Sequence, residues 1–248
     1  MPASSNFNQA IRDAQTSSIV GPNVVQKALP YVGGGMGLTS VGVLGGLTLQ
    51  QSTIFQPLFF VAIIAQLVLF FIASSAANNA NNSKALPLLA TYSLLTGFTL
   101  SGIIAYAAIT LGVGSIATAA LATGITFIIA SYTGQRMSDN VGQALSGVVG
   151  LGMIGLIIAM VIQIIGSVFT GGGMPQGLEL MIAGFGTVLF VGMSFVDFYT
   201  MPRRYNDEQY LAGALGMYLT YINLFVFILR LMICLLYTSP SPRDLSTS

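Results

Sequence analysis

Residues 57–73 read PLFFVAIIAQLVLFFIA, an almost unbroken apolar run in which Gln66 is the single polar side chain. Because a helix rises 1.5 Å per residue, about 20 apolar residues cross the hydrocarbon core of a bilayer. We therefore expect a transmembrane helix over Pro57–Ala77. Six further apolar segments predict helices over Leu29–Leu49, Ala85–Leu111, Ser115–Thr133, Val141–Phe169, Leu178–Met201 and Tyr210–Ile233.

The composition of the 248 residues points to the same class of protein. Hydrophobic residues make up 54% of the chain and charged residues only 6%, against about 25% charged in an ordinary soluble domain. So few charges do not cover the surface of a soluble fold of this size, and a lipid bilayer is the natural solvent for the remaining apolar surface. The sequence indicates an all-α membrane protein, a bundle of seven transmembrane helices.

Several function classes have no support in the sequence. The net charge of +1 offers no electrostatic attraction for nucleic acid. The chain contains no histidine and one cysteine, Cys234, so it lacks the residues of a histidine-based catalytic triad or a cysteine-cluster metal site. A GxGxxG match at residues 150–155 falls inside an apolar helix with no preceding strand, which makes it a chance match. We expect no enzyme activity, no cofactor and no metal site.

The basic residues predict the orientation of the bundle. With the N-terminus inside, the three outer loops, residues 50–56, 112–114 and 171–176, contain no lysine or arginine. Basic residues concentrate on the cytoplasmic side of membrane proteins, so we expect a cytoplasmic N-terminus. The inner segments then hold Arg12, Lys27, Lys84, Arg136, Arg203 and Arg204.

Differences in composition along the sequence divide the chain into three parts. Residues 1–27 are polar and predict a cytoplasmic tail, and residues 28–233 form the membrane domain. Residues 234–248 read CLLYTSPSPRDLSTS and resemble a translated sequencing adapter. We therefore expect this last segment to be non-native and exclude it from reasoning about the fold.

Small residues recur at four-residue spacing in two of the predicted helices. Gly33 and Gly37 form one GxxxG step in the first helix, and Gly42 and Gly46 form a second. The third helix carries a similar ladder at residues 97, 101 and 105. Such ladders let helix backbones approach closely in lipid, and we interpret them as packing within the bundle rather than as a dimerisation motif.

Three charged residues fall within the predicted membrane segments: Glu179, Asp197 and Arg230. Charges at such depth are expensive and mark functional sites by default. Glu179 and Arg230 lie at similar depth near the outer surface, which predicts an intramembrane ion pair. Asp197 lies about one turn inside the inner surface. It is either an acid of an ion pathway or a solvated residue paired with the cytoplasmic loop charges Arg203 and Arg204.

The seventh helix carries small and polar residues at spacings of three and four, which places them on one face. We expect this face to turn into the bundle, with Leu224, Val226, Ile228 and Leu231 toward lipid. The residues of the face are Gly213, Gly216, Thr220, Asn223, Phe227 and Arg230.

Three segments carry a resemblance to a known family. Residues 92–101 read YSLLTGFTLS, residues 195–199 read FVDFY, and residues 214–225 read ALGMYLTYINLF, followed by ILRL at 228–231. These stretches resemble helices 3, 6 and 7 of the Bax inhibitor-1 family. The resemblance extends over about residues 28–232, and its helix 7 motif is the most specific part.

The resemblance implies a seven-helix bundle with helix 7 at the centre and a pH-sensitive calcium leak. In that picture two aspartates, on helices 6 and 7, share a proton and gate the pore. Asp197 matches the first aspartate, whereas Thr220 stands at the second position and cannot ionise near neutral pH. The two-carboxylate switch therefore does not carry over, and we expect an ion pathway of Asp197, Thr220 and Asn223.

Three functions remain open from the sequence. The first is a slow calcium or cation leak in a bacterial plasma membrane, with Asp197 at the cytoplasmic gate. The second is a non-conducting regulator that binds a membrane-bound AAA protease or another stress-response partner, as the resemblance implies for one bacterial branch. The third is an unrelated seven-helix transporter.

Overall fold

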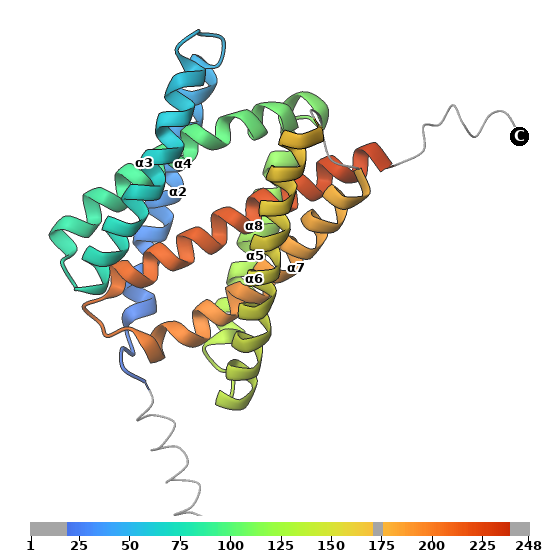
Figure 1. The fold of residues 1–248 in the computed structure, drawn as a ribbon. Coiled ribbons are helices and arrows are strands. Elements are labelled where there is room, and N and C mark those ends of the chain that lie inside the picture. The colour runs from blue at the N-terminus through green and yellow to red at the C-terminus, as the bar shows by residue number, and fades with distance from the viewer. Residues whose placement is uncertain (1–18, 171–175, 239–248) are drawn as a thin grey trace, which may run out of the picture. The chain divides into compact units, whose positions relative to one another are not determined.

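The structure, a computed structural model, describes residues 19–170 and 176–238, and the regular secondary structure in these ranges is entirely helical. Seven of these helices are long and apolar enough to cross a membrane, which confirms the predicted seven-helix membrane fold (Figure 1). The helices are α2 (Val24–Leu49), α3 (Phe55–Asn78), α4 (Asn82–Thr110), α5 (Val113–Gly134), α6 (Asp139–Thr170), α7 (Gln176–Arg204) and α8 (Tyr210–Thr238).

Most of these helices extend beyond the ranges that the sequence predicts. α2 begins at Val24 instead of Leu29, and α8 continues to Thr238 instead of ending at Ile233. The added turn of α2 is polar and carries Lys27, and hydropathy misses such turns at the membrane surface. The added residues of α8, 234–238, belong to the adapter-like segment that is excluded from the predicted helix. Residues 1–18 of the predicted N-terminal tail and residues 239–248 of the predicted non-native segment, which starts at residue 234, lie outside the described residues.

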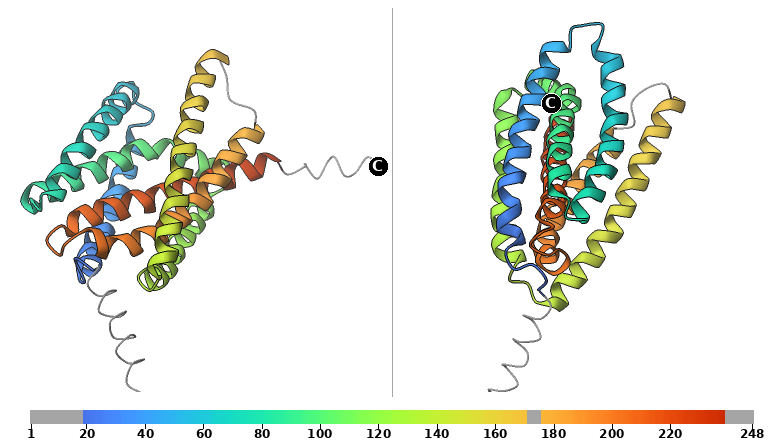
Figure 2. Two further views of the ribbon diagram at one scale, coloured as in Figure 1. Left: turned by 60° about the horizontal axis from the view of Figure 1, so that its bottom comes forward. Right: turned by 90° about the vertical axis from the view of Figure 1, so that its left-hand side faces the viewer.

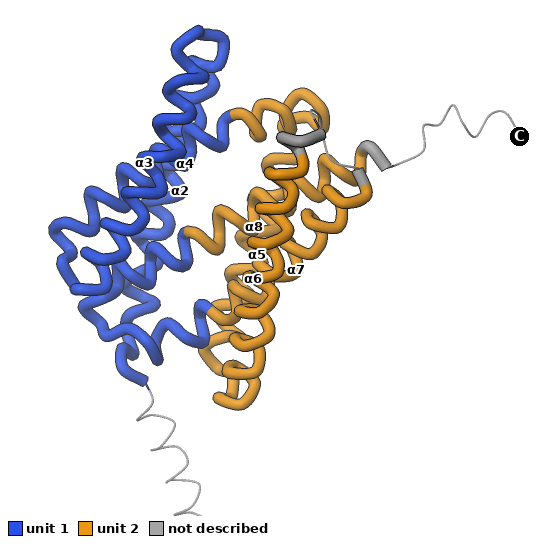
Figure 3. Tube along the Cα trace, in the orientation of Figure 1, with its two compact units in different colours: residues 1–101, 197–218 blue, residues 102–196, 219–248 orange. Residues whose placement is uncertain are grey.

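The chain divides into two compact units, coloured separately in Figure 3. Unit 1 comprises residues 1–101 and 197–218, and unit 2 comprises residues 102–196 and 219–248. Helices α4, α7 and α8 each contribute residues to both units. α8 also supplies many of the largest fully buried side chains, as expected for a central helix: Leu211, Met217, Tyr218, Leu224 and Leu229.

Unit 1 is built on close contact between α2 and α4. A side chain added at Gly42 would overlap the backbone carbonyl of Leu94, and one added at Gly97 would overlap that of Thr39. The second GxxxG step of α2 therefore packs within the bundle, as predicted. In contrast, a Cβ added at Gly33 or Gly37 would meet no described atom within 4 Å.

The third helix of unit 1, α3, forms a helical hairpin with α2 (Figure 2). It packs on α4 through a small apolar cluster of Phe55, Ala62 and Phe98. Its remaining surface is apolar and exposed, as at Ile64, whose side chain is 65% exposed. Such a surface is typical of a helix that faces lipid.

Unit 2 has its own apolar core. Ala107, Ala119, Phe225 and Leu229 form one buried cluster that joins α4, α5 and α8. Elsewhere in the unit, α7 packs on α8 where the rings of Phe190 and Phe227 stack with their centroids 5.4 Å apart. The core is therefore held by apolar contacts between these helices.

Candidate functional site

Asp197 lies in the last third of α7, within unit 1. Val196 and Phe198, which flank it in sequence, are buried, and its carboxylate oxygen Oδ2 is also buried. Placing a charged carboxylate in such surroundings is unfavourable, so acids of this kind are retained mainly for ion or proton chemistry. This placement is consistent with the predicted role of Asp197.

The two arginines at the end of α7 contact aromatic rings. The guanidinium of Arg203 lies 4.1 Å from the centroid of the Tyr199 ring, and its Nη1 donates a hydrogen bond of 2.8 Å to the Tyr199 carbonyl oxygen. The guanidinium of Arg204 lies 5.5 Å from the ring of Tyr205. Both cation–π contacts are local to the end of α7 and join it to no other helix.

The other two predicted pathway residues belong to α8 in unit 2. The side chain of Thr220 is only 3% exposed. Asn223 is half-buried, and its Nδ2 donates a 2.8 Å hydrogen bond to the Leu219 carbonyl oxygen in its own helix. An ion pathway of Asp197, Thr220 and Asn223 stays a prediction.

The predicted orientation of the α8 face is partly wrong. Gly213, Thr220 and Phe227 are buried as expected, but Gly216 is exposed. Leu224, which the sequence assigns to the lipid side, is fully buried. A helix packed on several sides has no single inward stripe, so the polar face alone does not define which of its residues are buried.

Arg230 makes a different polar contact from the one predicted. Its Nη2 lies 3.5 Å from Oε1 of Gln163 on α6. Glu179 and Arg230 both act electrostatically on Cys234, which places them in one region of unit 2. Their pairing stays a prediction.

Sequence reasoning did not find a buried set of polar side chains in unit 1, which we call the hydroxyl cluster. It links α2, α3, α4 and α8 through hydrogen bonds inside the membrane-spanning part of the unit. Its members are Thr39, Gln66, Ser93, Thr96, Thr99 and Tyr218.

Tyr218 is the centre of the hydroxyl cluster. Its side chain has no exposed surface, and its hydroxyl lies 2.6 Å from Oγ1 of Thr39. The side chains of Ser93 and Thr96 lie near this hydroxyl, and each donates its own proton to a carbonyl of α4. The ring rests against Gly35, where an added Cβ would lie 3.0 Å from the ring. The absence of a side chain at residue 35 thus makes room for Tyr218.

The hydrogen-bond distances determine which hydroxyl donates and which accepts in the bond between Thr39 and Tyr218. Oγ1 of Thr39 lies 2.9 Å from the Gly35 carbonyl oxygen and 3.1 Å from that of Ser93, so its one proton is donated to a carbonyl. Tyr218 then donates its proton to Thr39. Every group in this series of hydrogen bonds is neutral. The arrangement therefore holds helices together rather than binding a charge.

Gln66 extends the cluster to α3. Its Nε2 donates a 2.8 Å hydrogen bond to Oγ1 of Thr96, and its Oε1 accepts a 3.0 Å bond from Oγ1 of Thr99. Both ends of the amide are thus used between helices. Gln66, the single polar residue of the apolar run, was a visible signal in the sequence. Its partners were not, because serine and threonine in a helix often bond only to carbonyls of their own helix.

An apolar groove of about 370 Å³ lies between α2, α3 and α4. Its walls contain apolar side chains and glycines but no acid, amide or hydroxyl. The groove therefore has no chemistry for a cation. Its lining residues are Val41, Gly42, Gly45, Leu49, Leu58, Val61, Ala62, Ala65, Leu94, Leu95 and Phe98.

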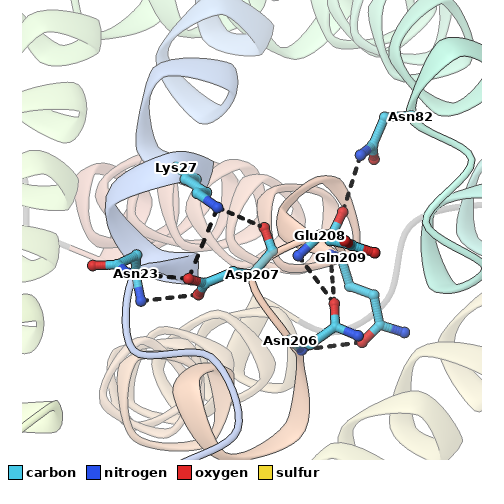
Figure 4. A network of polar contacts seen from close by, with 7 residues as sticks. All are labelled: Asn23, Lys27, Asn82, Asn206, Asp207, Glu208 and Gln209. Atoms are coloured by element: carbon cyan, nitrogen blue, oxygen red, sulfur yellow. Dashed lines mark hydrogen bonds and ion pairs between the residues drawn. The ribbon is translucent and has the colours of Figure 1, made fainter.

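A second polar set lies at one end of unit 1, where the loop between α7 and α8 meets other helix ends (Figure 4). Asp207 accepts hydrogen bonds from the backbone N–H of Asn23 at 2.9 Å and from its Nδ2 at 3.1 Å. Lys27 Nζ lies 3.8 Å from Oδ2 of Asp207. Desolvation acts to raise the pKa of Asp207, but the bonds from Asn23 and the charge of Lys27 outweigh it and lower the pKa below its ordinary value.

Comparison with known proteins identifies relatives across most of the chain. An uncharacterized membrane protein of Streptococcus pyogenes serotype M1 is 34% identical over 231 residues, which cover 87% of this chain and 95% of that protein. An uncharacterized protein of Deinococcus radiodurans is 27% identical over 195 residues, 75% of this chain and 77% of that protein. The Bax inhibitor 1 of Schizosaccharomyces pombe is 38% identical over 55 residues, 22% of this chain and 21% of that protein.

The family assignment follows from a match to a family model. Residues 21–235 match the sequence model of a family described as "Inhibitor of apoptosis-promoting Bax1", which sets aside the alternative of an unrelated transporter. Seven apolar helices and bacterial relatives that are named membrane proteins make this a multi-pass protein of the bacterial cell membrane. The chain belongs to the Bax inhibitor-1 family.

Proposed function

We propose that the protein is a slow, pH-modulated leak for calcium or another cation, in which Asp197 governs ion passage. The observation that carries the proposal is the buried Oδ2 of an acid within the membrane helix α7. Membership of the Bax inhibitor-1 family gives further support. Intramembrane acids occur mainly on ion and proton pathways.

The chemistry of a single carboxyl group accounts for both cation passage and pH modulation. The ionised group attracts a cation and offers it two oxygen ligands, the type that calcium prefers. Protonation removes the charge and turns one oxygen into a donor. A leak controlled by Asp197 therefore changes as this carboxyl group titrates.

Calcium flux into liposomes tests the proposal. We expect purified protein to conduct calcium above the level of empty liposomes, with a rate that varies between pH 6 and 8. Asp197→Asn keeps the size of the side chain but cannot ionise, so we expect an altered rate and a flat pH profile. A wild-type flux equal to that of empty liposomes would contradict the leak.

Glu179→Gln is the matched control for this experiment. It removes an acid from the same helix by the same chemical change, but near the opposite end of α7. We expect it to keep the wild-type rate and pH profile. If Asp197→Asn behaves like Glu179→Gln, the assignment of Asp197 to the pathway is wrong even though the protein conducts.

The proposed orientation places the N-terminal end of α2 in the cytoplasm. Lys27 of α2 and Asn82 of α4 both bond to the α7–α8 loop, so the basic residues near them share one end of unit 1. Basic residues favour the cytoplasmic side. In a Cys234→Ser background, an impermeant thiol reagent added to intact cells should label Gln51→Cys and leave Ser83→Cys unlabelled. The reverse labelling would invert the topology.

The second candidate function is a non-conducting regulator of a membrane-bound AAA protease or another stress-response partner. Thr220 favours it, because the family resemblance places an aspartate at this position and threonine supplies no second charge. Co-purification with a membrane protease, retained by a variant that has lost flux, would support this function. Loss of binding together with flux would favour the leak alone.

A further inference from the structure

The loop between α7 and α8 contacts the ends of three other helices of unit 1. Asp207 bonds to Asn23 at the start of α2. The backbone carbonyl of Glu208 accepts a 3.0 Å hydrogen bond from Nδ2 of Asn82, the first residue of α4. Nε2 of Gln209 donates a 2.6 Å hydrogen bond to the carbonyl of Asn78, the last residue of α3. Three consecutive residues thus contact three helix ends, and Figure 4 shows the bonds of Asp207 to Asn23 and of Glu208 to Asn82.

Asp207 supplies the cap that α2 does not provide for itself. The residue before α2, Asn23, makes no side-chain capping bond to its own helix. A helix N-terminus leaves backbone N–H groups without partners and carries a partial positive charge. The carboxylate of Asp207 meets both needs, since it accepts the N–H of Asn23 and brings a negative charge to this end.

The loop is also braced internally. Oδ1 of Asn206 accepts 3.0 Å hydrogen bonds from the backbone N–H groups of Glu208 and Gln209. Oε1 of Gln209 accepts a 3.1 Å bond from the backbone N–H of Asn206. These bonds fix the shape of the loop. The loop therefore connects the end of α7 to α2, α3 and α4 through a short, rigid segment.

The end of α7 is held at the same place by a further contact. The backbone N–H groups of Val20 and Gly21 donate to the Pro202 carbonyl at 2.8 and 3.0 Å. Gly21 lies so close to the loop that an added side chain would overlap the Tyr205 carbonyl. The segment before α2 and the end of α7 are therefore packed backbone to backbone.

We propose that residues Asn206–Gln209 form a latch that fixes the Asp197-bearing end of α7 to α2, α3 and α4, with Asp207 as its fastening residue. Opening the latch loosens the end of α7, which the bonds from Val20 and Gly21 to Pro202 then hold. This inference rests on the proposed function for one consequence only, that an open latch increases the cation leak.

The latch is distinct from the pH response assigned to Asp197. The bonds from Asn23 and the charge of Lys27 keep the pKa of Asp207 below its ordinary value, so its carboxylate stays ionised between pH 6 and 8. The latch accordingly stays fastened over this range, and its removal should shift the size of the leak rather than the pH at which it changes.

Hydrogen exchange of the detergent-solubilised full chain tests the latch without reference to flux. Asp207→Ala removes every side-chain acceptor, so we expect exchange at the Asn23 amide and in the last turn of α7 to become about fivefold faster, the scale of a lost helix cap. Glu208→Ala is the matched control, because Glu208 enters the network through its backbone. We expect wild-type exchange in this variant.

A milder variant separates the cap from the charge. Asp207→Asn keeps an oxygen for the Asn23 N–H but loses the attraction to Lys27. Asparagine is as good a helix cap as aspartate, and exposed ion pairs contribute little. We therefore expect its exchange to lie much closer to the wild type than to Asp207→Ala, which also shows that the fold tolerates substitution at residue 207.

The outcomes of exchange and flux are separable. Unchanged exchange in Asp207→Ala would overturn the latch, whatever the flux. If the wild type does not conduct, the proposed function fails and the exchange result alone decides the latch. If the wild type conducts, Asp207→Ala should leak several-fold faster and Glu208→Ala at the wild-type rate. Faster exchange without a faster leak would uphold the latch and overturn only the consequence that an open latch increases the leak.

Discussion

Replacing Gly97 with alanine tests the close contact between α2 and α4. A Cβ at this position would overlap the carbonyl oxygen of Thr39 and lie 2.8 Å from both the Thr39 carbonyl carbon and the Val43 nitrogen. These are backbone atoms of a helix, which cannot rotate away as a side chain can. The two helices must therefore separate to admit the methyl group.

The size of the effect follows from three contributions. Forcing a methyl group into a packed core costs about 1–3 kcal/mol. Separation of the helices also strains the 2.6 Å bond between Thr39 and Tyr218, and a hydrogen bond is worth about 0.5–1.5 kcal/mol net. Alanine offsets part of this, because it is about 1 kcal/mol more favourable than glycine in a helix. We expect a net loss of about 1–2 kcal/mol in the free energy of unfolding, a factor of about 5–30 in the folded ratio.

Gly37→Ala provides the control, since it is the same substitution on α2 where an added Cβ meets no described atom within 4 Å. We expect it to be neutral or stabilising by up to about 1 kcal/mol. Unfolding by sodium dodecyl sulfate in mixed micelles, followed by far-ultraviolet circular dichroism, compares the two variants with the wild type. Equal stability of Gly97→Ala and Gly37→Ala would refute the close approach at Gly97.

Two further predictions concern single polar side chains. Tyr218→Phe removes the hydroxyl that joins α8 to Thr39 and should lower the free energy of unfolding by about 1 kcal/mol, whereas Tyr132→Phe, on an exposed ring, should leave it unchanged. Acid titration of stability should show the contribution of Asp207. Its pKa is lowered in the folded state from the ordinary value of 3.8, so its contribution is present above that value and is lost as the pH falls through the folded pKa. Asp207→Ala should lack this acid-dependent part, and an unchanged acid profile would argue against the bonds to Asn23.

Hydropathy was sufficient to predict all seven helices, because each needs about 20 apolar residues in lipid and few other folds produce such runs. It was not sufficient for the ends of the helices. The turn that carries Lys27 at the start of α2 is helical but polar, as is the turn that carries Arg203 at the end of α7. Beyond the hydrocarbon, hydrogen bonding rather than hydropathy decides where a helix stops.

Contacts between distant segments were harder to predict. The bond between Asn23 and Asp207 joins residues 184 positions apart, and neither residue type is unusual in a surface loop. The hydroxyls of Thr39 and Tyr218 are common in membrane helices, where they often bond to carbonyls of their own turn. Only the packing of α2, α4 and α8 shows that these two hydroxyls meet.

The polar residues within the membrane differ in whether they can carry charge. Tyr218 and Thr39 hydrogen-bond to each other, and Gln66 bonds to Thr96 and Thr99. All of these groups are neutral, so they fix helices in place. Asp197 can switch its charge, and Thr220 stands where the family resemblance implies a second acid. Two coupled carboxyls titrate in two steps that belong to the pair, whereas one carboxyl titrates in a single step. If Asp197 alone governs the leak, its pH profile must follow one protonation, and a profile with two separated steps would require a second acid that α8 does not supply at residue 220.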